Sequence, residues 1–393
     1  MRLLIVQYGG DYREVFQRLA ENGVETYHAQ KYLINAVTDI SKQIEETTLF
    51  CCRTKESYSV VLQDGLRAVG AGLDPYKQKR ELLKLIAEQN PTHLVIHAPI
   101  PALFNWAIQN KIKTLGLLAD SFSGKGLRRQ IRNYFLARLL NNKHIEVIGN
   151  HGINASLSLQ KIGVNPNKII PWDWPHFVTP DFYAPKNLPE NKNQINLIYV
   201  GAIQESKGVG DIIRAVAKLK NLPINLQVAG KGEIDYFTQQ AKQLNIEDCV
   251  NFLGLVPHHQ IIDLMRKADI VIVPSRHEYP EGFPLTIYEA FCSRTPIVAS
   301  DHPMFKGNLQ DGVNAMTFPA GNSTALAMCI EMLLKPNLYY SLSEASADAW
   351  KRLQIPVKWA ELVNRWLHDS PENQHWLSEH RLTSGIYNSK FTY

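Results

Sequence analysis

Short apolar runs alternate along the chain with longer stretches in which apolar residues recur every three or four positions. This alternation is typical of βαβ units that build a parallel sheet. In the first part of the chain the runs predict strands at Leu3–Gln7, Thr48–Cys52, His93–His97, Thr114–Ala119 and Ile145–Gly149. In the second part they predict strands at Ile195–Gly201, Ile224–Gly230, Val250–Gly254, Asp269–Ser275, Pro296–Ser300 and Ala315–Phe318. The pattern therefore predicts an α/β protein with two sheets.

A stretch without apolar periodicity separates the two sets of strands. Val178–Gln194 is rich in proline and asparagine, which is typical of a linker. We therefore predict two α/β domains, residues 1–185 and 190–369. The tail 370–393 is rich in aromatic residues that a solvated segment would not need, so we expect it to pack back on the first domain.

The composition fits a globular protein and excludes several other classes. The 393 residues are 45% apolar and 20% charged, so the chain can bury a core. A formal charge of +5 is too small to predict nucleic-acid binding. Five cysteines without CxxC spacing predict neither a disulfide framework nor a structural zinc site, so we expect a reducing, cytoplasmic location. No stretch approaches the roughly 18 apolar residues of a membrane helix.

The segment Val273–Cys292, VPSRHEYPEGFPLTIYEAFC, carries the clearest chemical pattern. A buried strand ends in a polar loop, and Gly282-Phe283-Pro284 opens a helix with proline at its first position. A helix start of this kind binds phosphate well, and loops after parallel strands are where α/β proteins bind ligands. The N–H groups that we expect to face a phosphate are those of Gly282, Phe283, Leu285 and Thr286.

Two carboxylates, Glu281 and Glu289, flank this helix start. Because phosphate repels them, their natural partners are neutral hydroxyls, such as those of a ribose and a sugar ring. Each glutamate taken alone has a simpler interpretation, as a carboxylate favoured by the helix dipole or as a solvated helix residue. The pair, with Gly-Phe-Pro between its members, favours hydroxyl binding.

Glycines and a lysine after other predicted strands add to this picture. Lys207 begins a helix shortly after the strand that ends at Gly201, and it can reach a phosphate. Gly230 and Gly232 follow the next strand, but neither this pair nor Gly9-Gly10 completes a GxGxxG fingerprint. This argues against a nicotinamide or flavin dehydrogenase.

These segments together resemble the retaining glycosyltransferases of family 4, over about residues 195–335. The most specific part is the pair of glutamates separated by seven residues, Glu281-x7-Glu289. The other matching pieces are Gly201…Lys207-Gly208, Val228-Ala-Gly-Lys-Gly232, Asn251-Phe-Leu-Gly254, Thr295-Pro-Ile-Val-Ala-Ser300 and Asp311-Gly-Val-Asn314. The resemblance implies the GT-B fold, in which two Rossmann-like domains face a deep cleft and the C-terminal segment crosses back to the first domain.

The resemblance also implies a nucleotide-sugar donor and a role for each matching residue. Glu281 would bind sugar hydroxyls, Glu289 the ribose, and Lys207 the diphosphate, while the base would pack near Gly230–Gly232 and Leu255–Pro257. The resemblance implies no metal, and the sequence has no Asp-x-Asp motif for one. The expected donor-binding residues are Gly9, Gly10, Gly201, Lys207, Gly230, Gly232, Val256, Arg276, Glu281, Gly282, Phe283, Pro284, Leu285 and Glu289.

The sequence departs from the family pattern at two places. Ala202 stands where the family commonly has an arginine, and Arg276 is a candidate to replace that diphosphate cation. Many members place a histidine near the reacting face of the sugar, whereas here Asp120 occupies the position that we align. His97, at the end of the preceding predicted strand, is the other candidate, and its simpler interpretation is a hydrogen-bonded histidine at a strand end. We expect Lys207, Glu281 and Asp120 to be the catalytic residues.

The acceptor is less defined than the donor, and a glycan, a lipid-linked acceptor and a small molecule all remain open. Lys125–Lys143 predicts a basic amphipathic helix. One interpretation is a solvated charged face above a packed apolar stripe. The other is peripheral contact with anionic lipid at the inner face of the membrane, or with a phosphate-bearing acceptor. Alternatives to a transferase are a GT-B epimerase and a non-catalytic protein that binds nucleotide sugar or glycan.

Overall fold

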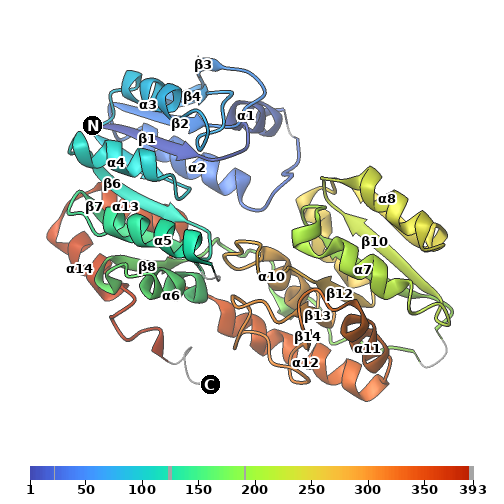
Figure 1. The fold of residues 1–393 in the computed structure, drawn as a ribbon. Helices are drawn as coiled ribbons and strands as arrows, with labels where there is room; N and C mark the ends of the chain where they lie inside the picture. Colours follow the sequence, from blue (N-terminus) through green and yellow to red (C-terminus); the bar gives the residue numbers. More distant parts are fainter. Residues whose placement is uncertain (22, 123–125, 190–191, 389–393) are drawn as a thin grey trace. The chain divides into compact units, whose positions relative to one another are not determined.

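The computed structural model describes the chain apart from residues 22, 123–125, 190–191 and 389–393 (Figure 1). The chain divides into two compact units. Among the described residues, the first contains those of Met1–Glu25, Ala29–Pro175 and Ile355–Asn388, and the second contains those of Thr26–His28 and His176–Gln354. Among the described residues no helix combines the length and apolarity needed to cross a bilayer. Of the predicted features, Lys125, Phe391 and Tyr393 lie outside the described part.

The first unit is built on one mixed sheet with the strand order β3-β4-β2-β1-β5-β6-β7-β8. Only the pair β3–β4 is antiparallel. Strands β2 to β4 lie on one side of β1, and strands β5 to β8 lie on the other. The strand order therefore reverses between β1 and β5, which creates a topological switch point. The strands are β1 Arg2–Gln7, β2 Glu46–Cys51, β3 Tyr58–Val61, β4 Leu66–Gly70, β5 His93–Ile96, β6 Lys113–Leu118, β7 Ile145–His151 and β8 Ile169–Trp172.

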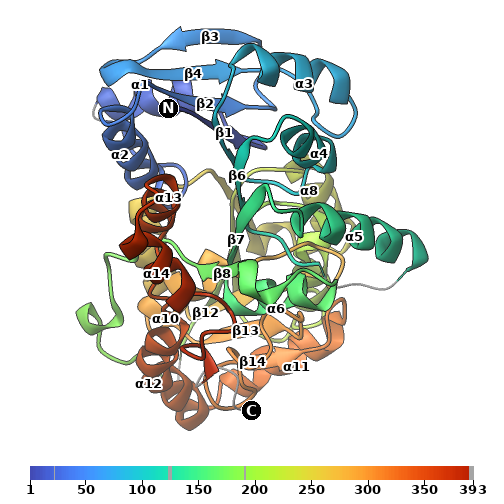
Figure 2. The ribbon, with the colours of Figure 1, turned by 90° about the vertical axis from the view of Figure 1, so that its left-hand side faces the viewer.

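Helices cover both faces of this sheet (Figure 2). Two of them, α13 and α14, come from the end of the chain, and α13 packs beside α2. The apolar run Ile355, Val357 and Trp359 is almost fully buried in the core of the first unit. The helices are α1 Tyr12–Ala20, α2 Gln30–Ser41, α3 Lys79–Glu88, α4 Pro101–Gln109, α5 Leu127–Leu140, α6 Ile153–Lys161, α13 Trp359–Leu367 and α14 Pro371–Glu379.

A buried carboxylate fixes the point where the chain returns to the first unit. Asp173, which is 0% exposed, accepts a 3.0 Å bond from His151 and forms a 3.7 Å ion pair with Lys358. Its backbone N–H donates to the carbonyl of Val357. Because a buried charge must be paired, these contacts hold the crossing segment to the end of β8.

The second unit has a fully parallel six-stranded sheet with the order β11-β10-β9-β12-β13-β14. Its switch point lies between β9 and β12. The strands are β9 Ile195–Val200, β10 Ile224–Ala229, β11 Val250–Gly254, β12 Ile270–Val273, β13 Ile297–Ser300 and β14 Met316–Phe318. The helices are α7 Val209–Val216, α8 Ile234–Gln243, α9 Ile261–Lys267, α10 Leu285–Cys292, α11 Ser323–Leu333 and α12 Pro336–Leu353.

The domain boundaries differ from those predicted at 185, 190 and 370. The proline-rich stretch is packed on the second unit, since Lys186 donates to the carbonyl of Arg266 at 2.7 Å and Leu188 is 7% exposed. The second unit therefore begins at His176, and the chain rejoins the first unit at Ile355, about 15 residues before the predicted tail. The tail itself packs on the first unit, where Leu377 and Tyr387 are buried.

Candidate functional site

Lys207 and Glu281 meet at the switch point of the second sheet. Lys207 ends the short helical turn Glu205–Lys207 that follows β9, and Glu281 lies in the loop that follows β12. The ammonium of Lys207 forms an ion pair with Glu281, whose carboxylate also accepts a 2.6 Å bond from Ser275. Both charged side chains are largely buried, at 14% and 8% exposure. The Lys207 ammonium also lies 4.3 Å from the centre of the Tyr279 ring.

A glycine allows the loop that carries Lys207 to approach the end of β12. Gly208 has φ +79°, and a Cβ there would lie 2.3 Å from the carbonyl oxygen of Pro274. Next to it, the N–H of Arg276 donates to the carbonyl of Ser206 at 3.0 Å. Backbone contact between the two loops thus holds the lysine and the glutamate together, and a side chain at position 208 would separate them.

The predicted glycines Gly201, Gly230 and Gly232 also lie where two loops touch. A Cβ on Gly230 would lie 1.8 Å from the carbonyl oxygen of Gly201, and one on Gly232 would lie 2.1 Å from that of Ile203. Residues Ile203 and Gly232 pair as an isolated bridge. These glycines are therefore required by close backbone packing after β9 and β10, whatever else they bind.

Arg276 does not present a free cation at this site. Its guanidinium is 2.8 Å from both carboxylate oxygens of Asp211 and 2.5 Å from Glu205, and Arg214 completes the network. The hydrogen bond to Asp211 raises the pKa of Arg276. The expectation that Arg276 replaces a missing diphosphate cation is not favoured by this geometry, because two carboxylates already hold its charge.

The helix start differs in one detail from the prediction. Pro284 is the extended N-cap residue rather than the first helical residue, and α10 begins at Leu285. The N–H of Ile287 donates to the carbonyl of Pro284, and the Thr286 hydroxyl donates to the carbonyl of Val200, the last residue of β9. Gly282 and Phe283 are buried, so the helix start is anchored beside the end of β9.

Glu289 has a partner that the sequence did not predict. Its carboxylate lies 2.9 Å from Nε2 of His258, and that nitrogen lies 3.1 Å from Nδ1 of His28. The three ligand atoms lie within 4.8 Å of one another, so this group is able to hold a divalent metal ion. The signal available in the sequence was weak, since neither His28 nor His258 belongs to a recognisable motif.

In the first unit the predicted residues Gly9, Gly10 and His97 follow β1 and β5, at the switch point of that sheet. His97 is a half-buried histidine whose Nε2 accepts a 3.2 Å bond from the Trp359 indole N–H. Burial lowers its pKa to about 3, so it is neutral. These contacts favour the simpler interpretation of His97, as a hydrogen-bonded histidine at a strand end.

Asp120 lies just beyond β6 and has a perturbed carboxyl group. Burial raises its pKa to about 6. Its backbone carbonyl accepts a 3.0 Å bond from Asn150 at the end of β7, which holds the turn. A carboxyl group that changes charge near neutral pH is a candidate for chemistry, and Asp120 fits this better than His97 does.

The structure thus brings together only part of the predicted set. Lys207 and Glu281 contact each other, and the glycines after β9 and β10 pack against one another. Val256 lies half-buried after β11, and Arg276 belongs to the network with Asp211. Gly9, Gly10 and Asp120 belong to the other unit. The residues that the prediction missed are Ser275, Tyr279, His28 and His258.

Comparison with known proteins gives matches to one family of enzymes. The family model described as "Glycosyl transferases group 1" matches residues 183–349. An uncharacterized glycosyltransferase of Methanocaldococcus jannaschii is 26% identical over 52% of this chain and 53% of its own length. Glycogen synthase of Mycobacterium tuberculosis is 32% identical over 27% of this chain and 25% of its own length. The matches therefore span about half of these curated relatives or less.

The fold is shared over nearly the whole chain with a solved structure. Anabaena HepE in complex with UDP-glucose has a TM-score of 0.66 and 16% sequence identity, and the alignment covers 96% of this chain and 100% of that one. At this identity the match shows the fold alone.

Proposed function

Because the chain belongs to the group 1 glycosyltransferases of family 4 and has the GT-B fold, we propose that it transfers a sugar from a nucleotide-diphosphate sugar to an acceptor hydroxyl. The proposal includes retention of the anomeric configuration, as in the family. The second unit would bind the donor, and the first unit would bind the acceptor, through the loops after β1 and β6 that carry Gly9, Gly10 and Asp120.

The contact between Lys207 and Glu281 is the observation that carries this proposal. It places a cation and an anion side by side at the switch point where open α/β sheets bind ligands. A donor with a negative diphosphate joined to a neutral sugar matches that pair, with the diphosphate on Lys207 and sugar hydroxyls on Glu281. Ser275 supports the role of Glu281, because its hydroxyl fixes the orientation of the carboxylate.

The remaining donor contacts follow from the position of α10. We expect the N–H groups from Gly282 to Leu285 to donate to the diphosphate or the sugar, since the first N–H groups of a helix lack partners within it. Glu289 would accept the ribose hydroxyls, in exchange for its bond to His258. Gly201, Gly230, Gly232 and Val256 would form the floor beneath the nucleoside.

In the proposed reaction the bond from sugar C1 to the diphosphate oxygen breaks, and a bond from C1 to the acceptor oxygen forms. The proton of the acceptor hydroxyl goes to an oxygen of the leaving diphosphate. Negative charge grows on that diphosphate, so fixed donors there stabilise the transition state more than the ground state. Lys207 and the start of α10 would supply these donors.

The test is a thermal-shift screen followed by an assay of nucleotide-diphosphate release. UDP-glucose is the first donor to test, because HepE, which shares the fold, was solved in complex with it; GDP-, ADP- and dTDP-sugars follow. A donor at 100 times its Kd stabilises the folded state by about 2.7 kcal/mol. Slow release of nucleotide diphosphate without acceptor supports a transferase, whereas stabilisation without any release supports a non-catalytic binding protein.

A further inference from the structure

The apolar stripe of α5 faces solvent instead of the core. Leu127, Ile131 and Phe135 are 73%, 48% and 59% exposed. They follow one another at four-residue intervals and so share one face of the helix. The opposite face is the buried one, formed by Asn133, Leu136, Ala137 and Leu140. The interpretation of this helix as a charged face above a packed apolar stripe therefore holds for Leu136, Ala137 and Leu140 but fails for Leu127, Ile131 and Phe135.

The charges around this stripe are all positive. Helix α5 contains four arginines and no carboxylate. Within the described part of the chain none of these arginines takes part in an ion pair, and the guanidinium of Arg138 lies 6.0 Å from the centre of the Tyr134 ring. Arg128, Arg132 and Arg138 are exposed. An exposed apolar stripe bordered by uncompensated cations fits a surface that is both apolar and negatively charged.

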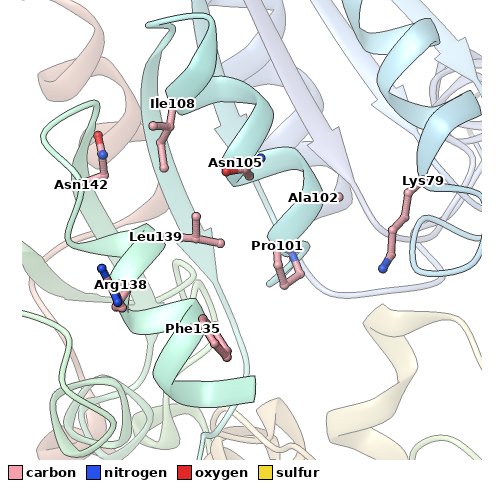
Figure 3. A pocket seen from close by; sticks show the side chains of 9 residues that line it. All are labelled: Lys79, Pro101, Ala102, Asn105, Ile108, Phe135, Arg138, Leu139 and Asn142. Atoms are coloured by element: carbon pink, nitrogen blue, oxygen red, sulfur yellow. The ribbon is translucent and has the colours of Figure 1, made fainter. Parts of the chain in front are cut away.

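A hollow of about 510 Å³ adjoins the same face. It lies between α3, α4 and α5, with Lys79 on the α3 side and Phe135, Arg138 and Leu139 on the α5 side (Figure 3). Its other polar side chains are the amides of Asn105 and Asn142. The hollow therefore offers two cations and two hydrogen-bonding amides beside exposed apolar side chains, which is a suitable environment for a phosphate headgroup.

We propose that this face of the first unit docks on an anionic lipid bilayer. Leu127, Ile131, Tyr134 and Phe135 enter the interface between headgroups and acyl chains, and the arginines contact lipid phosphates. The hollow beside Lys79 and Arg138 receives a headgroup. Charge complementarity selects a lipid surface over a second copy of this chain, because two such faces would repel each other. The inference goes beyond the proposed glycosyl transfer and does not depend on it.

The test is vesicle flotation of the whole chain, with no measurement of activity. We expect binding to vesicles of phosphatidylglycerol and phosphatidylcholine, at least tenfold weaker binding to phosphatidylcholine alone, and release at high salt. The double variant Ile131→Ser/Phe135→Ser tests the apolar stripe, and Arg128→Gln/Arg132→Gln tests the charges. Each should lower the bound fraction at least tenfold, and Lys79→Gln should lower it by about threefold.

A matched control replaces exposed apolar side chains elsewhere. Tyr236→Ser/Met328→Ser removes two side chains of the second unit that are 59% and 57% exposed, and it should leave flotation unchanged. An unchanged thermal transition shows that the variants are folded. Absence of flotation, or an equal loss in the control variant, overturns the proposal. Sedimentation that shows a dimer broken by the Ile131→Ser/Phe135→Ser change also overturns it in favour of self-association.

Discussion

The two sheets have the same kind of switch point, yet the residues found there differ. Between β9 and β12 the loops carry charged side chains that contact each other, with Lys207 paired to Glu281. Between β1 and β5 the loops carry Gly9, where an added Cβ would meet nothing within 4 Å, and His97, a neutral histidine bonded to Trp359. At the second unit's switch point a cation from one loop is paired with an anion from the other. At the first unit's switch point Gly9 has open space around it, and the ion pair that follows, Asp11 with Arg13 at 3.6 Å, lies within the start of α1.

This difference fits a division of work between the units. A donor that always carries a diphosphate can be bound by a fixed cation on a rigid loop. Such a preorganised cation also stabilises the negative charge that develops in the transition state. An acceptor whose chemistry varies within a fold is better met by loops that can change without disturbing the core. Under the proposed function, the loops of the second unit would therefore be more closely constrained than those of the first.

The largest effect is expected for Lys207→Ala. Loss of one fixed donor to a developing anion costs about 2.7–4 kcal/mol, which corresponds to a 100- to 1000-fold lower kcat. The measurement is the rate of nucleotide-diphosphate release with a saturating donor. Lys242→Ala is the matched control, because Lys242 is an exposed lysine on α8, outside the loops that would hold the donor. Equal rates of nucleotide-diphosphate release in both variants would exclude a catalytic role for Lys207, and the charge at this switch point would then be structural only.

Glycine substitutions test whether packing really differs between the two switch points. Gly230→Ala forces a Cβ to within 1.8 Å of a backbone oxygen at φ +146°, so it should destabilise the second unit by about 2–3 kcal/mol. Gly9→Ala has open space and should change stability by less than about 0.5 kcal/mol. Chemical denaturation measures the change in unfolding free energy for each variant, provided that the unfolding of the two units is followed separately. Similar losses in the two variants would contradict the contrast.

A smaller effect is expected for Arg276→Ala, and it should appear in stability. The change leaves the buried Asp211 with one of its two arginine partners, Arg214, which costs about 1–2 kcal/mol. Affinity for the donor should stay within about twofold, since the carboxylates of Asp211 and Glu205 already hold this guanidinium. A tenfold loss of donor affinity with an unchanged denaturation midpoint would instead restore Arg276 as a diphosphate cation.

Much of the fold could be predicted because its signals are local. The predicted strands from β9 to β14 lie within two residues of their observed ends, since each is a short apolar run bounded by polar residues. The strands β3, β4 and β8 were missed. For β3, Tyr58–Val61, the reason is its place at the sheet edge, where half-buried and exposed positions alternate. The return of the chain at Ile355 was missed too, because its anchor, Asp173, is distant in sequence.

The site was predictable to the extent that a contiguous motif encodes it. Glu281 and Glu289 share one segment, whereas the partners of each come from elsewhere: Lys207 from the loop after β9, and His258 from the start of another helical segment. Which charges cancel cannot be determined from spacing alone. Arg276 illustrates this limit, because the carboxylate that pairs with it belongs to Asp211, which lies 65 positions away in the chain.

The last prediction asks whether Asp120, which follows β6 in the first unit, acts in the proposed reaction. Its folded pKa of about 6 exceeds the unfolded value of 3.8, so it is protonated below pH 6 in the folded state. If its carboxylate acts on the sugar, the transfer rate should fall about tenfold between pH 7.5 and pH 5. The Asp120→Asn variant should be slow at both pH values and show no such fall. The matched control Asp39→Asn changes an exposed aspartate and should show the same tenfold fall as the unchanged protein.

Stability provides an independent readout for the same residue. Between about pH 4 and pH 6 the unfolded chain has already lost the Asp120 proton that the folded chain retains, so the contribution of this group to stability falls as the pH rises through 6. Asp120→Asn removes the buried charge and should raise the unfolding temperature by a few degrees at pH 7.5 and by nothing at pH 4. A variant that is more stable yet slower would mean that the fold tolerates this charge for the sake of the reaction. A variant that is less stable at pH 7.5 would make Asp120 a structural residue, without a part in the proposed reaction.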